Sequence, residues 1–290
     1  MSDTFPTLAA ALPPAALFTG LLDDAALFPP GNAPMQAGID AYLRSLHGED
    51  APYIGAFLCP WSRTGELRAA LPSDVMIDLS LTISDGIEAL DDALAAVAAD
   101  DRLTLRAVEL PAGSAGVPPT LDALDAGLPA GVLAYVELPL DDHVAANAAV
   151  IAAAGRGVKV RTGGTTAAAF PTCRELALGL LGCAHADVPF KLTAGLHNAF
   201  RHHDTSNGFE HHGFLNVMAA VASATDGADL PEVASLLDVL DFSMLRQWAA
   251  TVPAAEATRV RTAFIGFGTC STAEPLADLR TLGLLPEVKS

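Results

Sequence analysis

Two of the three lysines in this chain of 290 residues lie inside short apolar segments, where lysine amines can act as nucleophiles. Lys159 lies in the segment GVKVRTGG, and Lys191 lies in the segment PFKLTAG. A lysine surrounded by apolar residues loses hydration, which lowers the pKa of its amine toward neutrality. A neutral amine attacks carbonyl carbons and forms a Schiff base. The two segments therefore point to carbonyl chemistry.

Both lysine segments belong to a series of strand-like segments separated by alanine-rich helical stretches. Each strand-like segment is a short apolar run bounded by turn residues. The stretches between them are long enough to cross back over a sheet. The predicted strands cover residues 24–28, 53–59, 75–81, 103–110, 132–138, 158–162, 190–194 and 262–268.

Eight strand–helix units predict a closed (β/α)8 barrel of the α/β class, known as a TIM barrel. The first seven predicted strands begin 22 to 32 residues apart, which fits the length of a β–α unit. The last interval is longer, so we expect residues 196–260 to elaborate the seventh unit, between the last two strands. We expect residues 1–22 to cover the bottom of the barrel, and one domain to span residues 1–290. A doubly wound open sheet is the alternative, although no G-x-G-x-x-G motif follows an early strand.

Ionisable side chains gather on the predicted strands near the end of the barrel that carries active sites in this fold. Because side chains alternate along a strand, Lys159 and Arg161 share one face, and Lys191 and Thr193 also share one face. Carboxylates nearby suit proton transfer to a bound carbonyl compound. The same charges are also compatible with a neutralised structural ion network. The candidate catalytic residues are Lys159, Lys191, Glu109, Glu137 and Asp78, and the candidate substrate contacts are Arg161, Thr193 and His197.

Glycine-rich turns follow the sixth and eighth predicted strands and are candidates for binding an anionic part of a substrate. The segments RTGGTT and GFGTCS place backbone N–H groups where barrels often bind phosphate. Thr172 with Glu175, and Ser271 with Glu274, have the spacing of helix capping boxes, which offers a structural explanation for the hydroxyls. The candidate anion-binding residues are Gly163, Gly164 and Gly268.

Residues 158–195, from VKVRTGG through FKLTAG, resemble the lysine pair of class I aldolases of the deoxyribose-phosphate aldolase type. In that family a lysine in a V-K-x-x-T-G segment of strand six forms the Schiff base, and a lysine of strand seven helps to lower its pKa. The resemblance implies that Lys159 is the Schiff-base residue and Lys191 its electrostatic partner, with no cofactor required. Arg161 and the segment LHNAFRHHD after Gly195 differ from the family's phosphate-binding turns, so the resemblance does not identify the substrate.

Five of the eight histidines lie within residues 197–212, together with Asp204 and Glu210. Imidazoles and carboxylates are ligands for Zn²⁺ and similar divalent metals, and three protein ligands with an open position make a catalytic site. No H-E-x-x-H motif is present, so an active-site loop that contacts substrate and a solvated surface loop remain alternatives. The candidate metal ligands are His197, His202, His203 and His211.

The four cysteines show neither the C-x-x-C spacing of metal or redox motifs nor the density of a disulfide framework. Cys59 ends one predicted strand and Cys270 comes just after another, where a nucleophile could lie. Neither has a basic neighbour in the sequence that would lower the pKa of its thiol, so we expect reduced and unreactive thiols. The remaining two cysteines are Cys173 and Cys183.

The amino-acid composition argues against nucleic acids and membranes as binding partners. Hydrophobic residues make up 51% of the chain, and the net charge of −18 repels nucleic acids and anionic membrane surfaces. The first residues contain neither a basic leader nor an apolar stretch of about 20 residues, so we expect a cytoplasmic protein. Alanine-rich outer helices are compatible with a homo-oligomer.

We therefore expect an aldolase-type lyase that acts on a small carbonyl or anionic compound through Lys159. One alternative is a metal-dependent hydrolase or isomerase that uses His197 with Glu109 and Glu137. Another is a barrel that binds a ligand without catalysis.

Overall fold

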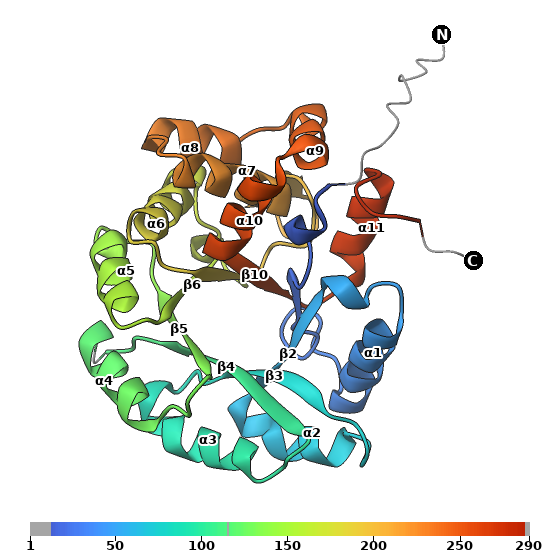
Figure 1. Ribbon diagram of the computed structural model, residues 1–290, viewed down its shortest axis with the longest axis vertical. Helices are drawn as coiled ribbons and strands as arrows, with labels where there is room; N and C mark the ends of the chain where they lie inside the picture. Colours follow the sequence, from blue (N-terminus) through green and yellow to red (C-terminus); the bar gives the residue numbers. More distant parts are fainter. Residues whose placement is uncertain (1–12, 115, 288–290) are drawn as a thin grey trace.

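The computed structural model describes residues 13–114 and 116–287 and has a closed barrel of eight parallel strands surrounded by helices (Figure 1). Around the barrel the strands follow the order β1, β10, β7, β6, β5, β4, β3, β2. Each neighbouring pair is parallel, as the helical crossovers between consecutive strands require. The (β/α)8 prediction is confirmed.

The barrel strands lie close to their predicted positions, except the first. The apolar segment after Asp24 was wrongly predicted to be a strand, because its buried side chains Ala25 and Leu27 belong to a loop that leaves the sheet toward Pro29 and Pro30. The strands are β1 (Leu22–Asp24), β2 (Ile54–Pro60), β3 (Ile77–Thr82), β4 (Leu103–Pro111), β5 (Leu133–Leu138), β6 (Gly157–Arg161), β7 (Phe190–Thr193) and β10 (Phe264–Thr269).

Helices on the outside of the barrel bury one face against the strands. In α6, for example, Leu176, Leu180 and Cys183 are buried. This helix begins at a capping box in which Thr172 and Glu175 bond each other's backbone N–H groups, as their spacing predicts. The barrel helices are α1 (Met35–His47), α2 (Thr64–Ala70), α3 (Leu90–Ala98), α4 (Val117–Gly127), α5 (Val144–Ala153), α6 (Cys173–His185) and α11 (Ala273–Thr281).

The long connection between β7 and β10 is elaborated, as its length predicts. It contains an antiparallel hairpin followed by helices, of which α7 is almost completely buried. The buried amide of Asn216 ties this region together, because it accepts from the N–H of Arg201 at 2.9 Å and donates to the carbonyls of Leu236 and Val239. Its elements are β8 (His202–Asp204), β9 (Phe209–His211), α7 (Phe214–Thr225), α8 (Leu230–Leu237), α9 (Phe242–Thr251) and α10 (Ala254–Ala263).

The segment before β1 packs at the amino end of that strand. Residues 1–12 of the predicted cover lie outside the described residues, whereas Leu17, Phe18 and Leu21 are buried. Arg261 of α10 holds this segment by donating to the carbonyl of Thr19 at 3.0 Å.

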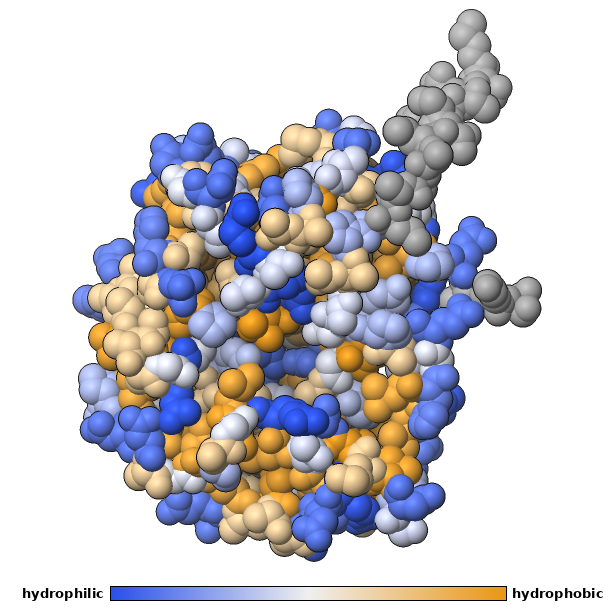
Figure 2. Space-filling model, viewed as in Figure 1, coloured by the Kyte–Doolittle hydropathy of each residue, from blue (hydrophilic) through white to orange (hydrophobic). Residues whose placement is uncertain are grey.

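The face of the molecule seen in Figure 1 mixes hydrophilic and hydrophobic residues and is hollowed near its centre (Figure 2). Across residues 13–114 and 116–287, no helix combines the length and the apolar character that crossing a bilayer requires.

Candidate active site

The register of three neighbouring strands brings both lysines and a glutamate to one level of the barrel. Lys159 on β6 is in register with Lys191 on β7 and with Glu137 on β5. Both lysine side chains are buried, together with the apolar residues on either side of them in the strands. The sequence therefore predicted correctly that the two amines come from adjacent strands.

Glu109 of β4 lies between the two amines and is completely buried. Its Oε2 lies 3.0 Å from Nζ of Lys159, and its Oε1 lies 2.5 Å from Nζ of Lys191. Ser80 Oγ of β3 donates to the same Oε1 at 2.8 Å. Burial alone would raise the pKa of this carboxyl, but the charges of Lys191 and Lys159 more than offset burial and hold its pKa well below the usual range. Glu109 is therefore a permanent carboxylate.

Asp23 of β1 is a member of the cluster that the sequence did not predict. Its Oδ2 forms a close ion pair with Nζ of Lys191, and its Oδ1 accepts from the N–H of Ala56 at 2.8 Å. Gly55 of β2 leaves room for this carboxylate, since a Cβ there would lie 2.1 Å from Oδ1. The sequence missed Asp23 because the first strand was placed one residue too late to include it.

Lys191 is held as an ammonium group. Burial would lower the pKa of this amine, but the carboxylates of Asp23 and Glu109 more than offset burial and raise its pKa above the ordinary value. The ring of Tyr135 lies 5.2 Å from Nζ and adds a cation–π contact. This lysine is therefore a fixed positive charge and not a nucleophile.

Lys159 lies at the more open edge of the same cluster. Its Nζ contacts Glu137 at 3.2 Å in addition to Glu109. The side chain of Glu137 is 23% exposed, and that of its next partner, Arg161 at 3.9 Å, is 52% exposed. Lys159 and Lys191 lie at the same level of the barrel and are both buried, so the difference between them lies in their partners. Arg161 lies two residues after Lys159, toward the carboxyl ends of the strands, where TIM barrels bind substrates. Lys159 is therefore the lysine whose carboxylate partner is partly exposed at this end.

Asp78 is not part of this cluster, and its predicted role is corrected. It is the second residue of β3 and is in register with Thr104, whereas Glu109 is in register with Thr82, four residues further along β3. Four residues of strand span about 13 Å. The half-exposed carboxylate of Asp78 instead pairs with Arg106 at 2.9 Å.

The remaining candidate substrate contacts lie beside the cluster. Thr193 is in register with Arg161 and with Gly268 of β10. Gly163 has a structural reason to be glycine, because a Cβ there would lie 2.9 Å from the Cα of Gly195 in the next turn. Gly164 follows it and approaches Ala169 closely.

The four candidate metal ligands are not brought together. His197 bonds Glu274 at 2.9 Å, whereas His202, His203 and His211 lie on the β8–β9 hairpin. There the rings of His202 and His211 lie 5.2 Å apart, and His203 instead bonds Glu210. Within the described residues no three His, Cys, Asp or Glu side chains are arranged to hold a metal ion. The candidate histidines are close in the sequence because three of them lie on one hairpin and His197 lies in the segment that leads to it.

Two contacts of His197 were not predicted. Its Nε2 faces the thiol of Cys270 at 3.9 Å, and its Nδ1 bonds Glu274. The capping box predicted for Ser271 and Glu274 is wrong, because α11 begins after Thr272 without a side-chain cap, which leaves the Glu274 carboxylate for the imidazole. Cys270 thus has a basic partner in space that it lacks in the sequence.

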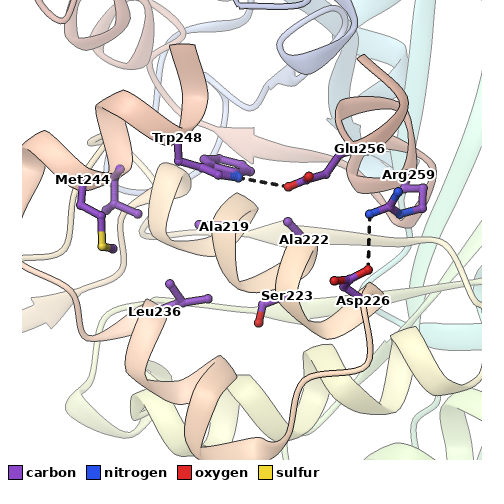
Figure 3. A pocket seen from close by; sticks show the side chains of 10 residues that line it. Ala219, Ala222, Ser223, Asp226, Leu236, Met244, Trp248, Glu256 and Arg259 are labelled. Carbon is purple, nitrogen blue, oxygen red and sulfur yellow. Dashed lines mark hydrogen bonds and ion pairs between the residues drawn. The ribbon is translucent and has the colours of Figure 1, made fainter. Parts of the chain in front are cut away.

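A separate cavity of about 300 Å³ lies among helices α7 to α10 (Figure 3). Two polar interactions border it. Nε1 of Trp248 donates a hydrogen bond to Glu256 at 3.2 Å, and the guanidinium of Arg259 forms an ion pair with Asp226 at 3.9 Å. None of its lining residues belongs to the charged cluster in the barrel.

Comparison with known proteins leaves the family of this chain open. No family model matches the sequence, and no curated protein matches it.

Proposed function

We propose that this protein is a lyase of the class I aldolase kind, which binds a small carbonyl compound as a Schiff base on Lys159. One observation carries the proposal: Nζ of Lys159 lies between a permanent carboxylate, Glu109, and a partly exposed one, Glu137, at the open edge of the buried cluster. The aldolase-like V-K-x-x-T-G segment around this lysine supports the same assignment.

The residues present are sufficient for each proton transfer. Glu137 takes a proton from the Lys159 ammonium, whose nitrogen lies 3.2 Å away, and the neutral amine then attacks the substrate carbonyl. Glu137 returns that proton to the departing hydroxyl of the carbinolamine, so that water leaves and an iminium ion forms. Glu137, again a carboxylate, then takes the proton of the substrate's β-hydroxyl group as the carbon–carbon bond breaks, so that an aldehyde leaves and the iminium ion accepts the electron pair of that bond and becomes an enamine. Glu137 returns this proton to the enamine carbon, and water hydrolyses the resulting iminium ion, which releases the second carbonyl product and regenerates the Lys159 amine.

Lys191 and Glu109 support this chemistry without reacting. Lys191 remains an ammonium between Asp23 and Glu109, and the negative charge of Glu109 stabilises the iminium ion on Lys159. Arg161, half exposed beside Glu137, is placed to bind an anionic group of the substrate. We therefore expect carbonyl compounds with a carboxylate or phosphate to be preferred.

The proposal is tested by incubation with small aldehydes, ketones and 2-oxo acids in the presence of borohydride, which reduces imines to stable secondary amines. Peptide mapping then locates the mass adduct, and Lys289 is the internal control for non-specific labelling. We expect the adduct on Lys159 with at least one carbonyl class. Lys159→Arg is the matched variant, since it keeps a positive charge next to Glu109 but cannot form an imine. An adduct equally distributed over the lysines, or none across the panel, would contradict the Schiff-base proposal and favour a barrel that only binds a ligand.

A metal-dependent reaction receives less support from the described residues, because its four predicted histidine ligands do not converge.

A further inference from the structure

A Cys–His–Glu arrangement lies at the carboxyl end of β10, outside the charged cluster. Nε2 of His197 is 3.9 Å from Sγ of Cys270, and Nδ1 of the same ring is 2.9 Å from Oε2 of Glu274. The two ring nitrogens thus face a thiol and a carboxylate on opposite sides. This is the order in which a nucleophile, a base and an orienting acid occur in covalent catalysis.

Three different elements supply these side chains. Cys270 directly follows β10, His197 lies shortly after the neighbouring strand β7, and Glu274 lies in the first turn of α11. The hydroxyl of Thr269 lies 3.4 Å from Nδ1 and also borders the ring. Glu274 and Thr269 therefore both border the Nδ1 side of the imidazole, which leaves Nε2 facing Cys270.

The arrangement is open to small molecules. Cys270 and the His197 ring are partly exposed, and the side chain of Glu274 is 57% exposed. Partial burial raises the pKa of the Cys270 thiol, the carboxylates of Glu274 and Asp24 act in the same direction, and a hydrogen bond with the backbone of Gly31 acts against them. The sulfur therefore rests as a thiol and needs a base at the moment of attack, and Nε2 of His197 faces it.

We infer that Cys270 is a second covalent site, which accepts acyl groups from small esters or thioesters with His197 as the base and Glu274 as the positioning residue. His197 Nε2 takes the thiol proton while Sγ attacks the acyl carbonyl carbon. The tetrahedral intermediate collapses, the bond to the alcohol or thiol leaving group breaks, and the leaving group takes the proton from the imidazolium. Water then hydrolyses the thioester, with His197 again as the base, and releases the carboxylic acid.

This site is distinct from the Schiff-base site and does not depend on it. Lys191 is in register with Gly266, and Cys270 lies four residues further along the chain from that glycine. Within residues 13–114 and 116–287, the partners of Lys159 are Glu109 and Glu137, and those of His197 are Glu274, Thr269 and Cys270, so the two groups share no hydrogen bond or ion pair. Loss of one chemistry is therefore expected to leave the other unchanged.

The first test compares the alkylation rates of two cysteines in the same molecule. Cys173 is partly exposed like Cys270, but its thiol faces the carboxylate of Asp238 at 3.7 Å in place of an imidazole. With limiting iodoacetamide and peptide mapping, we expect Cys270 to be alkylated about 10-fold or more faster than Cys173, because a general base assists the thiol. The buried Cys59 and Cys183 report on folding, since they are labelled only if the chain opens.

Variants separate the roles of the ring and the carboxylate. His197→Gln is expected to reduce the alkylation rate of Cys270 to that of Cys173, while Cys59 and Cys183 stay unlabelled. Glu274→Ala is expected to reduce the rate in the wild-type background and to have no further effect in the His197→Gln background, because a positioning residue acts only through the ring. If Glu274 has only a structural role, Glu274→Ala should reduce the alkylation rate of Cys270 by the same factor in the wild type and in His197→Gln.

The acyl-transfer step is tested with p-nitrophenyl acetate. We expect a burst of one equivalent of p-nitrophenol and an acetyl group on Cys270, both lost in Cys270→Ser and retained in Lys159→Arg. Equal alkylation of Cys270 and Cys173, or an unchanged rate in His197→Gln, would overturn the assignment of His197 as the base. Acetylation without a preference for Cys270 would overturn the acyl-acceptor site. Imine trapping on Lys159 tests the Schiff-base proposal alone, and its result does not depend on the result for Cys270.

Discussion

The amines of Lys159 and Lys191 share one carboxylate, with Lys159 on Oε2 of Glu109 and Lys191 on Oε1. The second carboxylate partner differs between the two lysines. Asp23, which pairs with Lys191, is buried and bonded to the backbone of Ala56, whereas Glu137, which pairs with Lys159, is partly exposed. One buried ion network therefore has a structural half around Lys191 and an accessible half around Lys159.

Substitution of the two lysines by methionine should separate these halves. Lys191→Met leaves Asp23 and Glu109 buried with one fewer positive charge, and we expect it to lower the free energy of unfolding by about 3–5 kcal/mol. Lys159→Met is expected to cost less, about 1–2 kcal/mol, because both of its carboxylate partners remain stabilised. Glu109 still pairs with Lys191, and the partly exposed Glu137 still has Arg161 nearby and access to solvent. Urea denaturation of both variants measures the difference. Equal losses would show that the network is uniformly structural.

Glu137→Gln tests the proton transfer assigned to this carboxylate. The amide cannot accept the proton of the Lys159 ammonium, so we expect the rate of imine trapping to fall about 100-fold while the fold is retained. Arg161→Met is the control, and it should weaken trapping of carbonyl compounds that carry a carboxylate but not of neutral ones. A trapping rate unchanged by Glu137→Gln would remove this residue from the mechanism.

Gly55→Ala tests whether the close approach of β2 to Asp23 is required. Because the added Cβ would lie 2.1 Å from Oδ1 of Asp23, the carboxylate must move away from the Ala56 N–H and from Lys191. We expect a loss of about 2–3 kcal/mol in the free energy of unfolding. Gly65→Ala in α2 is the matched control, since no atom lies within 4 Å of its Cβ, and it should be neutral or stabilising by about 0.5–1 kcal/mol. Similar effects of both changes on the denaturation midpoint would contradict the role of Gly55.

Asp24 should give stability a dependence on pH. Burial is the main cause that raises its pKa from 3.8 to about 6, with the charge of Asp23 acting in the same direction and the hydrogen bond from the Ala26 N–H opposing it. The folded state therefore binds the proton more tightly than the unfolded state. The stability that this provides is present at pH 4 and is lost as the pH rises through about 6, by up to about 3 kcal/mol.

Asp24→Asn isolates this effect, because the amide oxygen still accepts from the Ala26 N–H, 2.9 Å from Oδ1 in the wild type. We expect the variant and the wild type to have similar unfolding free energies at pH 4 and the variant to be more stable at pH 7. Urea denaturation between pH 4 and pH 7.5 measures the difference. A constant difference across this range would mean that Asp24 does not titrate there.

Asn216→Ala tests the link between α7 and the rest of the elaborated connection. The change leaves the Arg201 N–H and the carbonyls of Leu236 and Val239 without their buried partner. We expect a loss of about 3 kcal/mol in the free energy of unfolding, measured by thermal or urea denaturation. Asn207→Ala, on the exposed hairpin turn, is the comparison and should change stability little.

The amino-acid sequence by itself determined the alternation of strands and helices and therefore the barrel. Short apolar runs at regular intervals leave few other ways to bury the strands, so the strand bounds were predicted closely from 53–59 onward. The charged residues inside strands, such as Lys159, Lys191 and Glu109, were also evident, because charges interrupt apolar runs. The periodic pattern failed only at the first strand, where a buried loop is as apolar as a strand.

Only the tertiary structure decided which charges meet. Asp23 and Lys191 are far apart in the sequence, and their contact depends on closure of the barrel, which brings β1 next to β10 and β10 next to β7. The same closure placed His197 against Cys270, although neither has a basic or acidic partner beside it in the sequence. Asp78 shows the reverse case, because the register of β3 and not its residue type removed it from the site. Residue types and local spacing predict elements, whereas distances between side chains depend on register and closure, which are properties of the whole barrel.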